Sequence, residues 1–238
     1  MLLLAIFEIL IHFYFNFTTH HKNIFFGKLK RFNPQKIEAV NRTHTINIMN
    51  LFILSIDPAK AAEEMMDKHI HKILLEAVQM LSTAVRVLIP DPHLDPDLDE
   101  QLYKLAHKNH PVTIWCRTSR ANFIWTLDHI DALHAEWKYR YAHPESKIHK
   151  SYQVAQIIRQ NIPADHLFPS PESCGLTPFA LAMPDQYKDP SGDAVASYRA
   201  YYMSPEKTRI AKWAKRRSAP SWWMPPPFTS SVTPVAAI

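Results

Sequence analysis

The sequence predicts a mainly α-helical fold, a compact multi-helix single domain with a long proline-rich loop. Glycine is scarce, with only three residues in 238, and tight β-hairpins depend on glycine at positive φ. The 19 prolines concentrate in residues 90–96, 163–190 and 220–234, which leaves proline-poor stretches between them. Apolar residues recur at helical spacing in those stretches, so we expect them to form helices.

Composition limits the class of protein. Hydrophobic residues make up 47% of the chain and charged residues 21%, which is typical of a globular protein. The two cysteines, Cys116 and Cys174, form no disulfide framework and no paired metal-binding motif, so we expect free thiols in an intracellular compartment. The sequence contains no phosphate-binding glycine loop and no Gly-x-Ser-x-Gly motif, which argues against those two enzyme classes.

Residues 1–48 differ in composition from the rest, and we expect them to be an extension outside the core. They hold seven of the twelve phenylalanines and no aspartate. Residues 1–17 are mostly apolar, but they are interrupted by Glu8 and fall short of the ~20 residues that span a bilayer. A weak apolar anchor, a helical extension, and an upstream start with Met49 as the working one all stay open. No stable membrane association is expected.

The domain itself is expected over residues 49–223, followed by a proline-rich tail over residues 224–238. Asn50–Ile56 is apolar and short, so it is either a strand or an extended lead-in. Asp57 and Pro58 mark a helix start, because aspartate is a good cap and proline is favoured at the first helical position.

Helical periodicity predicts the elements that follow. One long amphipathic helix is expected from Ala62 to about Val87, and a second over Arg117–Tyr141. Shorter helices are expected over Leu98–Lys108, Ser146–Asn161, Ser191–Met203 and Pro205–Ala214. The break at His110–Pro111 and the proline-rich loop over residues 162–190 separate them.

The first long helix carries the candidate chemistry. His69, Lys72, Glu76 and Gln79 fall within about 80° of one another on a helix that turns ~100° per residue. An imidazole, an ammonium and a carboxylate on one line, beside an apolar stripe, form a candidate site for proton transfer or attack at carbon. A polar line beside an apolar stripe is also typical of any amphipathic helix, and this structural interpretation stays open.

The second long helix carries a matching polar line. Its members, Asn122, Trp125, His129, Glu136 and Arg140, fall within about 60° of one another. If the apolar stripes of the two helices pack together, the polar lines meet at one rim. Although the chain has 14 histidines, none has the spacing of helical metal ligands, so we expect no metal and no other cofactor.

The C-terminal third is basic and aromatic. Eight basic residues face three acidic ones between Lys188 and Trp223, and such an excess favours a polyanionic partner, DNA first. The aromatic residues either stack on bases or pack in the core. No obligate protein partner is evident. The candidate nucleic-acid-binding residues on the three segments are Gln79, Asn122, Trp125, His129, Arg140, Arg199, Lys212, Lys215, Arg216 and Arg217.

Several short motifs occur together between residues 49 and 223. They are Asp67-Lys68-His69-x-x-Lys72-x-x-x-Glu76-x-x-Gln79, Asn109-His110-Pro111, Asn122-Phe123-x-Trp125, Glu136-x-x-x-Arg140, the segment 177–185, Tyr198-Arg199-x-Tyr201-Tyr202 and Trp222-Trp223. This combination resembles a family of small proteins from tailed phages and large DNA viruses. The resemblance implies an intracellular location in the host cytoplasm or nucleus, and it favours Met49 as the working start.

The spacing Asp67-x-His69, with Glu76 seven residues beyond the histidine, and the segment from Leu133 to Arg140 resemble pyrimidine-dimer DNA glycosylases of the endonuclease V type. The resemblance implies that an amine attacks C1′ of a damaged nucleotide, the base leaves and a Schiff base forms. Glu76 would stabilise the charge on the sugar and move a proton, and His69 would orient a phosphate or Glu76. The amine in that family is the α-amine of the mature N-terminus.

These observations lead to one hypothesis and its rivals. We expect a viral-type DNA-binding protein, specifically a DNA glycosylase/AP lyase that acts on damaged or modified pyrimidines, with Glu76, His69 and Lys72 as catalytic residues. The amine is that of a chain starting at Met49, or the side chain of Lys72 or Lys68. The alternatives are a non-catalytic nucleic-acid-binding protein, a nucleotide- or base-modifying enzyme of another reaction, and a protein anchored through residues 1–17.

Overall fold

The computed structural model describes residues 49–225. Within this range it has eight α-helices and three 3₁₀-helices, and no strand is assigned there. The predicted mainly helical fold is therefore confirmed, and Asn50–Ile56 is an extended lead-in rather than a strand. The apolar stretch at residues 1–17 and most of the predicted tail lie outside the described residues.

The start of the helical region follows the prediction, but the predicted long helix is divided. Helix α2 spans Pro58–Glu64, and Asp57 caps it by accepting a hydrogen bond from the Ala59 N–H at 2.8 Å. Helix α3 spans Asp67–Leu88, and the two residues between the helices, Met65 and Met66, are extended. The continuous helix predicted from Ala62 to Val87 was therefore wrong at this point.

A residue far away in the sequence accounts for the break. The Arg140 guanidinium lies in the α2–α3 junction and donates hydrogen bonds to the main-chain carbonyls of Met65 at 2.7 Å and Glu63 at 2.8 Å. A carbonyl that accepts from a buried guanidinium is withdrawn from the regular i to i+4 pattern of a helix. The helical periodicity of the local sequence carries no sign of this partner.

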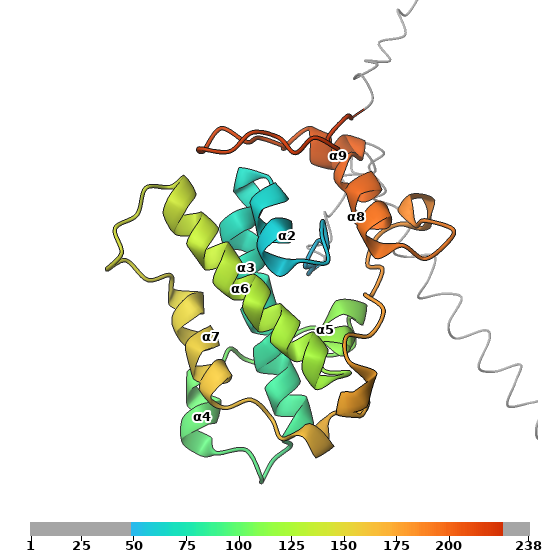
Figure 1. Ribbon diagram of the computed structural model, residues 1–238. Coiled ribbons are helices and arrows are strands. Elements are labelled where there is room, and N and C mark those ends of the chain that lie inside the picture. Colours follow the sequence, from blue (N-terminus) through green and yellow to red (C-terminus); the bar gives the residue numbers. More distant parts are fainter. Residues whose placement is uncertain (1–48, 226–238) are drawn as a thin grey trace, which may run out of the picture. The chain divides into compact units, whose positions relative to one another are not determined.

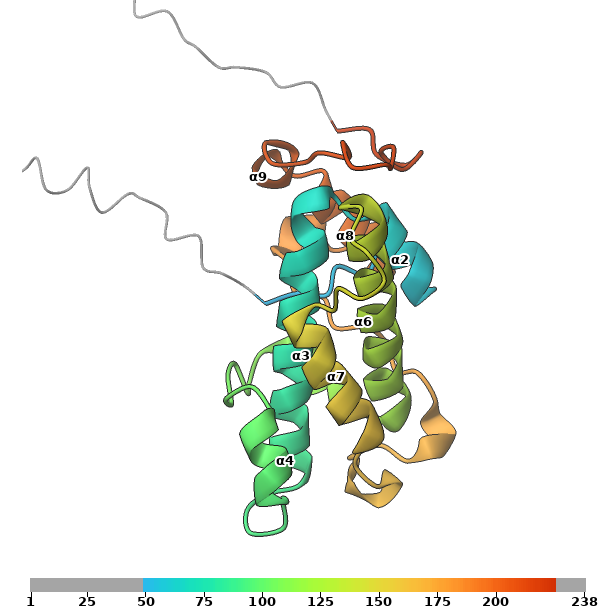
Figure 2. The same ribbon diagram turned by 90° about the vertical axis from the view of Figure 1, so that its left-hand side faces the viewer.

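Two long helices form the centre of the domain. Helix α6 spans Arg120–Arg140 and packs against both α2 and α3. Helix α7, Lys150–Gln160, packs against α3 and α6, and the short helix α5, Pro111–Cys116, packs against both long helices. The views in Figures 1 and 2 show α3, α6 and α7 running lengthwise beside one another.

The short helix that follows α3 is displaced from its prediction. Helix α4 spans Pro96–Gln101, whereas Leu98–Lys108 was predicted. The Asp95 side chain caps its start with Pro96 at the first position. Arg86 of α3 donates hydrogen bonds to the carbonyls of Asp99 and Leu102. In a longer helix these carbonyls would instead accept from main-chain N–H groups four residues further along.

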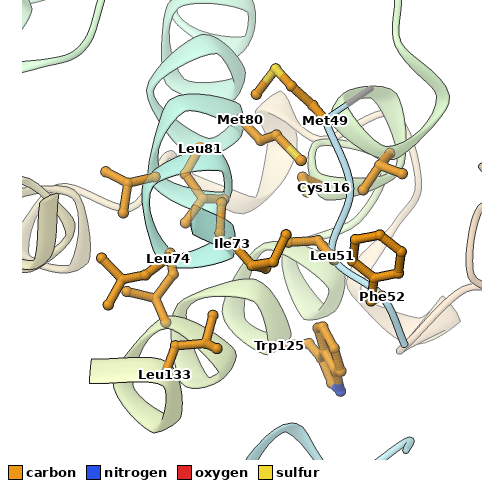
Figure 3. Close-up of a cluster of buried hydrophobic side chains, with 14 of the residues drawn as sticks. Met49, Leu51, Phe52, Ile73, Leu74, Met80, Leu81, Cys116, Trp125 and Leu133 are labelled. Atoms are coloured by element: carbon orange, nitrogen blue, oxygen red, sulfur yellow. The ribbon is translucent and has the colours of Figure 1, made fainter. Parts of the chain in front are cut away.

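The lead-in segment forms the middle of the hydrophobic core. Met49, Leu51, Phe52, Ile53 and Leu54 are all buried. Figure 3 shows Leu51 and Phe52 among side chains of α3, such as Ile73, and of α6, such as Trp125 and Leu133. Because the segment lies inside the domain, its main-chain groups must find partners there.

The C-terminal part wraps one end of the two long helices. After the irregular segment 161–193 come α8, Ala194–Tyr202, and α9, Pro205–Thr208. The predicted last helix, Pro205–Ala214, ends at Thr208 because the residues beyond it bond to the α2–α3 junction. The Lys212 carbonyl accepts from the Asp67 N–H at 2.8 Å, and the Trp213 indole donates to the Glu64 carbonyl at 3.1 Å. Figures 1 and 2 both show this segment, in red, crossing the end of the helices.

Candidate functional site

The carboxylate of Glu76 lies where α3 meets the lead-in segment. It is bound on one side by the Lys72 ammonium, with 2.8 Å between Nζ and Oε1, and on the other by the main-chain N–H of Asn50, at 3.1 Å from Oε2. The Glu76 side chain is 6% exposed and that of Lys72 is 33% exposed. The predicted neighbours Lys72 and Glu76 thus form an ion pair that is reached from solvent on the lysine side.

The lead-in turns sharply where it meets Glu76. The Asn50 carboxamide accepts from the Phe52 N–H at 3.1 Å and donates to the Ala182 carbonyl at 2.8 Å. Phe52 has a φ of +49°, a conformation that is uncommon for a bulky residue. Strained backbone of this kind persists where its surroundings hold it, and it is often found at functional sites.

His69 lies one turn of α3 before Lys72, in an aromatic setting. Its ring stacks on Phe52 with 4.7 Å between centroids, and its Nδ1 is 2.8 Å from the Tyr202 hydroxyl. Burial lowers the pKa of His69 well below its usual 6.5, and the nearby ammonium groups of Lys207 and Lys72 lower it further. His69 is therefore neutral at pH 7, and it positions aromatic side chains around the lead-in.

Lys207 of α9 joins this group, although the sequence did not single it out. Its Nζ lies over two aromatic rings, 5.3 Å from the centroid of Phe52 and 4.9 Å from that of Tyr201. Burial lowers the pKa of the Lys207 amine, and Lys72 lowers it further, while the Glu206 and Glu76 carboxylates oppose the shift. The only sequence signal was its place in the basic C-terminal third.

The polar line of α6 holds the same lead-in segment from the other side. The Trp125 indole donates to the Ile56 carbonyl at 2.7 Å, and the His129 Nδ1 lies 3.0 Å from the Pro58 carbonyl. Burial lowers the pKa of His129 to about 4, so it is neutral at pH 7. The two predicted polar lines thus share a neighbour, the segment from Asn50 to Pro58.

Asn122, near the start of α6, binds the proline-rich loop. Its carboxamide donates to the Trp115 carbonyl at 2.8 Å and accepts from the Thr177 N–H at 3.0 Å. The side chains of Asn122, Trp125 and His129 are buried against protein, and these contacts give all three a structural role.

A second ionic cluster surrounds Arg140. Its guanidinium binds Glu136 at 2.8 Å and Asp67 at 3.0 Å, and its side chain is fully buried. Arg217 from the C-terminal segment binds Glu136 from the other side at 2.5 Å. The two guanidinium groups outweigh burial and lower the pKa of Glu136. Arg140 and Arg217, both predicted to bind nucleic acid, here join the C-terminal segment to the helices.

Of the remaining predicted contacts, the two arginines bond to the protein, and the lysines are exposed. Arg199 donates to the Leu54 carbonyl at 3.0 Å and binds Glu64 at 3.2 Å, and Arg216 donates to the Tyr139 carbonyl. Lys212 and Lys215 are exposed, as is Lys68 on α3. Because the Lys212 carbonyl bonds the first N–H of α3, these lysines gather near the N-terminus of that helix. Gln79 is partly exposed, one turn beyond Glu76.

Within residues 49–225, no group of three or more histidine, cysteine, aspartate or glutamate side chains is arranged to bind a metal ion. None of the helices in this range is long and apolar enough to cross a bilayer. Comparisons of the chain with protein-family models, curated proteins and solved structures gave no match.

Proposed function

We propose that this protein is a DNA glycosylase/AP lyase of viral type that acts on damaged or modified pyrimidines through a Schiff base. The observation that supports the proposal is the arrangement at Glu76. Its carboxylate lies between the Lys72 ammonium and the main-chain nitrogen of Asn50. The resemblance to pyrimidine-dimer glycosylases implies a carboxylate beside an amine at this position.

Such a pair supplies the two functions that the reaction needs. An unprotonated amine attacks C1′ of the nucleotide, and the bond from C1′ to the base breaks. The carboxylate stabilises the positive charge that develops on the sugar and then accepts the C2′ proton. The candidate amines are the α-amine of a chain that starts at Met49, and the side chains of Lys72 and Lys68.

The surroundings of α3 are suited to phosphate groups. Lys68, Lys212 and Lys215 are exposed near the start of this helix. Cations at such places position the sugar–phosphate backbone without reading the base sequence. The acidic side chain at the same helix end, Asp67, is already bound by Arg140.

The experiment uses the full-length protein with supercoiled plasmid, either irradiated with ultraviolet light or left untreated. We expect nicking of the irradiated plasmid alone, a covalent protein–DNA adduct with sodium borohydride, and loss of both in Glu76→Gln. The matched control is Glu100→Gln, which alters an exposed glutamate of α4 and should behave as the wild type.

Binding without nicking or trapping, both by the full-length protein and by a chain that starts at Met49, would overturn the proposal and leave a non-catalytic nucleic-acid-binding protein. A parallel assay with a chain that starts at Met49 tests the α-amine. Activity found only in that shorter chain would assign the nucleophile to its N-terminus.

A further inference from the structure

We propose that a cavity beside the C-terminal half of α6 binds one unstacked nucleotide, with its base against aromatic side chains and its phosphate at Arg216. The cavity has a volume of about 760 Å³ and is lined by α6, the loop of residues 141–149, the start of α7 and the C-terminal segment. This volume is within the range of pockets that bind small ligands. The inference goes beyond the proposed function, because it involves neither Glu76 nor Lys72.

Aromatic rings form much of the cavity wall. His134 and Tyr152 stack face to face, with 3.7 Å between the ring centroids and 7° between the ring planes. Tyr139 and His143 line the same cavity, and Tyr139 is 46% exposed. Flat side chains at a cavity that opens to solvent suit a nucleobase, because every base has a face that can stack on such rings.

His134 also offers a hydrogen bond to a base. Burial lowers the pKa of His134 to about 4, so its ring is neutral at pH 7. The main-chain N–H of His149 donates to its Nε2 at 3.5 Å, which places the proton of the neutral ring on Nδ1. Among residues 49–225, this Nδ1–H has no hydrogen-bond acceptor. A ring nitrogen or a carbonyl oxygen of a base can accept from it.

The charges around the cavity favour a phosphate at Arg216. The two carboxylates in the wall are each bound by a cation, Asp131 by Arg159 at 2.7 Å and Glu145 by Lys138 at 2.7 Å. Arg216 has no carboxylate partner among the described residues. Its guanidinium donates to the Tyr139 carbonyl at 3.2 Å and lies 5.8 Å from the centroid of the Tyr139 ring. The remaining guanidinium donors can bind phosphate oxygens.

The backbone at the rim of the cavity is fixed in place. Ala142 and Arg216, both in the wall, have φ values of +52° and +60°, which are uncommon for residues other than glycine. At Ala142 the end of α6 holds this conformation, because the His143 N–H donates to the Lys138 carbonyl at 3.0 Å. At Arg216 the Tyr139 hydroxyl donates to the main-chain carbonyl at 3.4 Å. Figure 1 shows the C-terminal segment reaching the end of α6, where the loop to α7 begins.

The test measures binding of a single-stranded thymidine oligonucleotide with one 2-aminopurine to the full-length protein. The fluorescence of 2-aminopurine falls when its ring stacks, and we expect a saturable fall with the wild type. Arg216→Gly should weaken binding about tenfold, because a charge-assisted hydrogen bond to phosphate is lost. Glycine suits a positive φ, so this variant should stay folded, which urea denaturation checks. Arg216→Lys keeps the cation and should recover most of the affinity.

A second pair of variants places the ligand in the cavity. Ile148 and Ile114 are 40% and 42% exposed, and of the two only Ile148 lines the cavity. Ile148→Glu should weaken binding about tenfold, because its carboxylate repels the phosphate. Ile114→Glu changes the net charge equally and should bind as the wild type does. Equal weakening by the two variants would overturn the inference, as would the absence of a saturable fall with the wild type.

Free 2-aminopurine deoxyribonucleoside monophosphate distinguishes the two sources of the ligand. A saturable fall with this compound supports a site for a free nucleotide, and a fall with the oligonucleotide alone supports a site for a nucleic acid strand. The measurement involves no nicking and no trapping. A failure to bind therefore leaves the proposed lyase reaction standing, and a failure of the lyase assay leaves the nucleotide site standing.

Discussion

Glu76 on α3 and Glu136 on α6 each bind a cation four residues away, yet their surroundings differ. Glu136 is bound by two guanidinium groups, and the first of them, Arg140, is fully buried and also bonds Asp67 and main-chain carbonyls. Glu76 is bound by a lysine that is one-third exposed. Another lysine, Lys207, lies over the ring of Phe52 in the adjoining lead-in segment, and burial lowers its pKa.

The comparison separates a cluster whose donors all have protein partners from one for which we propose a catalytic role. In the arginine cluster, around Arg140, the guanidinium groups donate to partners on α3, α6 and the α2–α3 junction, and they connect these elements with the C-terminal segment. Arginine cannot lose its proton in a protein, which suits it to such a role. In the lysine cluster, around Glu76, the Lys72 side chain is one-third exposed, and an amine, unlike a guanidinium group, can lose its proton. The two clusters therefore predict different responses to mutation.

The largest effect is expected at Arg140. Arg140→Met leaves the carboxylates of Asp67 and Glu136 in or near the core without this partner, and it frees the carbonyls of the α2–α3 junction. We expect a loss of about 3–5 kcal/mol in the free energy of unfolding, measured by urea denaturation. Arg159→Met is the control, because it removes a partly exposed ion pair with Asp128 and Asp131 and should cost less than about 1 kcal/mol. Equal losses in the two variants would contradict the structural role of Arg140.

The next effect contrasts the two glutamates directly. Glu76→Gln should lower the rate of nicking by at least about 100-fold, because the proton acceptor is lost. Its stability should fall by less than that of Glu136→Gln, because the single amide oxygen can still accept from the Asn50 N–H and the partly exposed Lys72 ammonium can turn to water. Glu136→Gln should lower stability by about 1–3 kcal/mol, because hydrogen bonds to two guanidinium groups are weakened. The folded fraction of Glu136→Gln should retain activity. An active Glu76→Gln together with an inactive but stable Glu136→Gln would contradict the roles given to the two clusters.

The two clusters should also separate along the pH scale. The pKa of His69 in the folded protein lies below its usual 6.5, so its contribution to stability is present above pH 6.5 and is lost as the pH falls from there. The pKa of Glu136 is lowered from 4.5, so its contribution is lost only as the pH falls below 4.5. Urea unfolding over pH 3–7 measures both.

Variants identify which group causes each change. His69→Gln should flatten the stability profile just below pH 6.5 relative to wild type, and Glu136→Gln should flatten it below pH 4.5. Burial also lowers the pKa values of His129 and His134 to about 4, so the profiles of both variants keep some slope between pH 6.5 and pH 4. A His69→Gln profile parallel to wild type from pH 5 to 6.5 would contradict the burial of a neutral imidazole.

The smallest effect concerns binding to DNA. Lys212 and Lys215 are exposed, so replacing both by alanine should weaken binding to undamaged duplex. The slope of log affinity against log salt should fall by about 2. Arg217→Ala should leave this slope nearer to that of wild type, because Arg217 is bound by Glu136 and Glu63, and should instead lower stability. Fluorescence anisotropy at several salt concentrations measures the slopes.

The sequence predicted those features that depend on local spacing. The helix start at Asp57 and the pairing of Lys72 with Glu76 follow from caps and helical geometry, and both are present. The break at Met65 depends on Arg140, which lies 75 residues away. Local periodicity cannot register such a partner.

The same reason explains what was missed at the site. Lys207 reaches Phe52 only because α9 folds back over the lead-in, and its distance in sequence hides this contact. The polar line on α6 was correctly placed on one face, but its partners are main-chain carbonyls of Ile56 and Pro58. Main-chain partners leave no trace in the side-chain sequence.

Covalent trapping of the full-length protein on an abasic duplex decides whether the cluster around Glu76 is reactive. With sodium borohydride, we expect a stable adduct from the wild-type protein and a yield at least about 100-fold lower from Glu76→Gln, with binding to the duplex retained. A wild-type protein that binds the duplex and gives no adduct would contradict the claim that the lysine cluster around Glu76 is reactive.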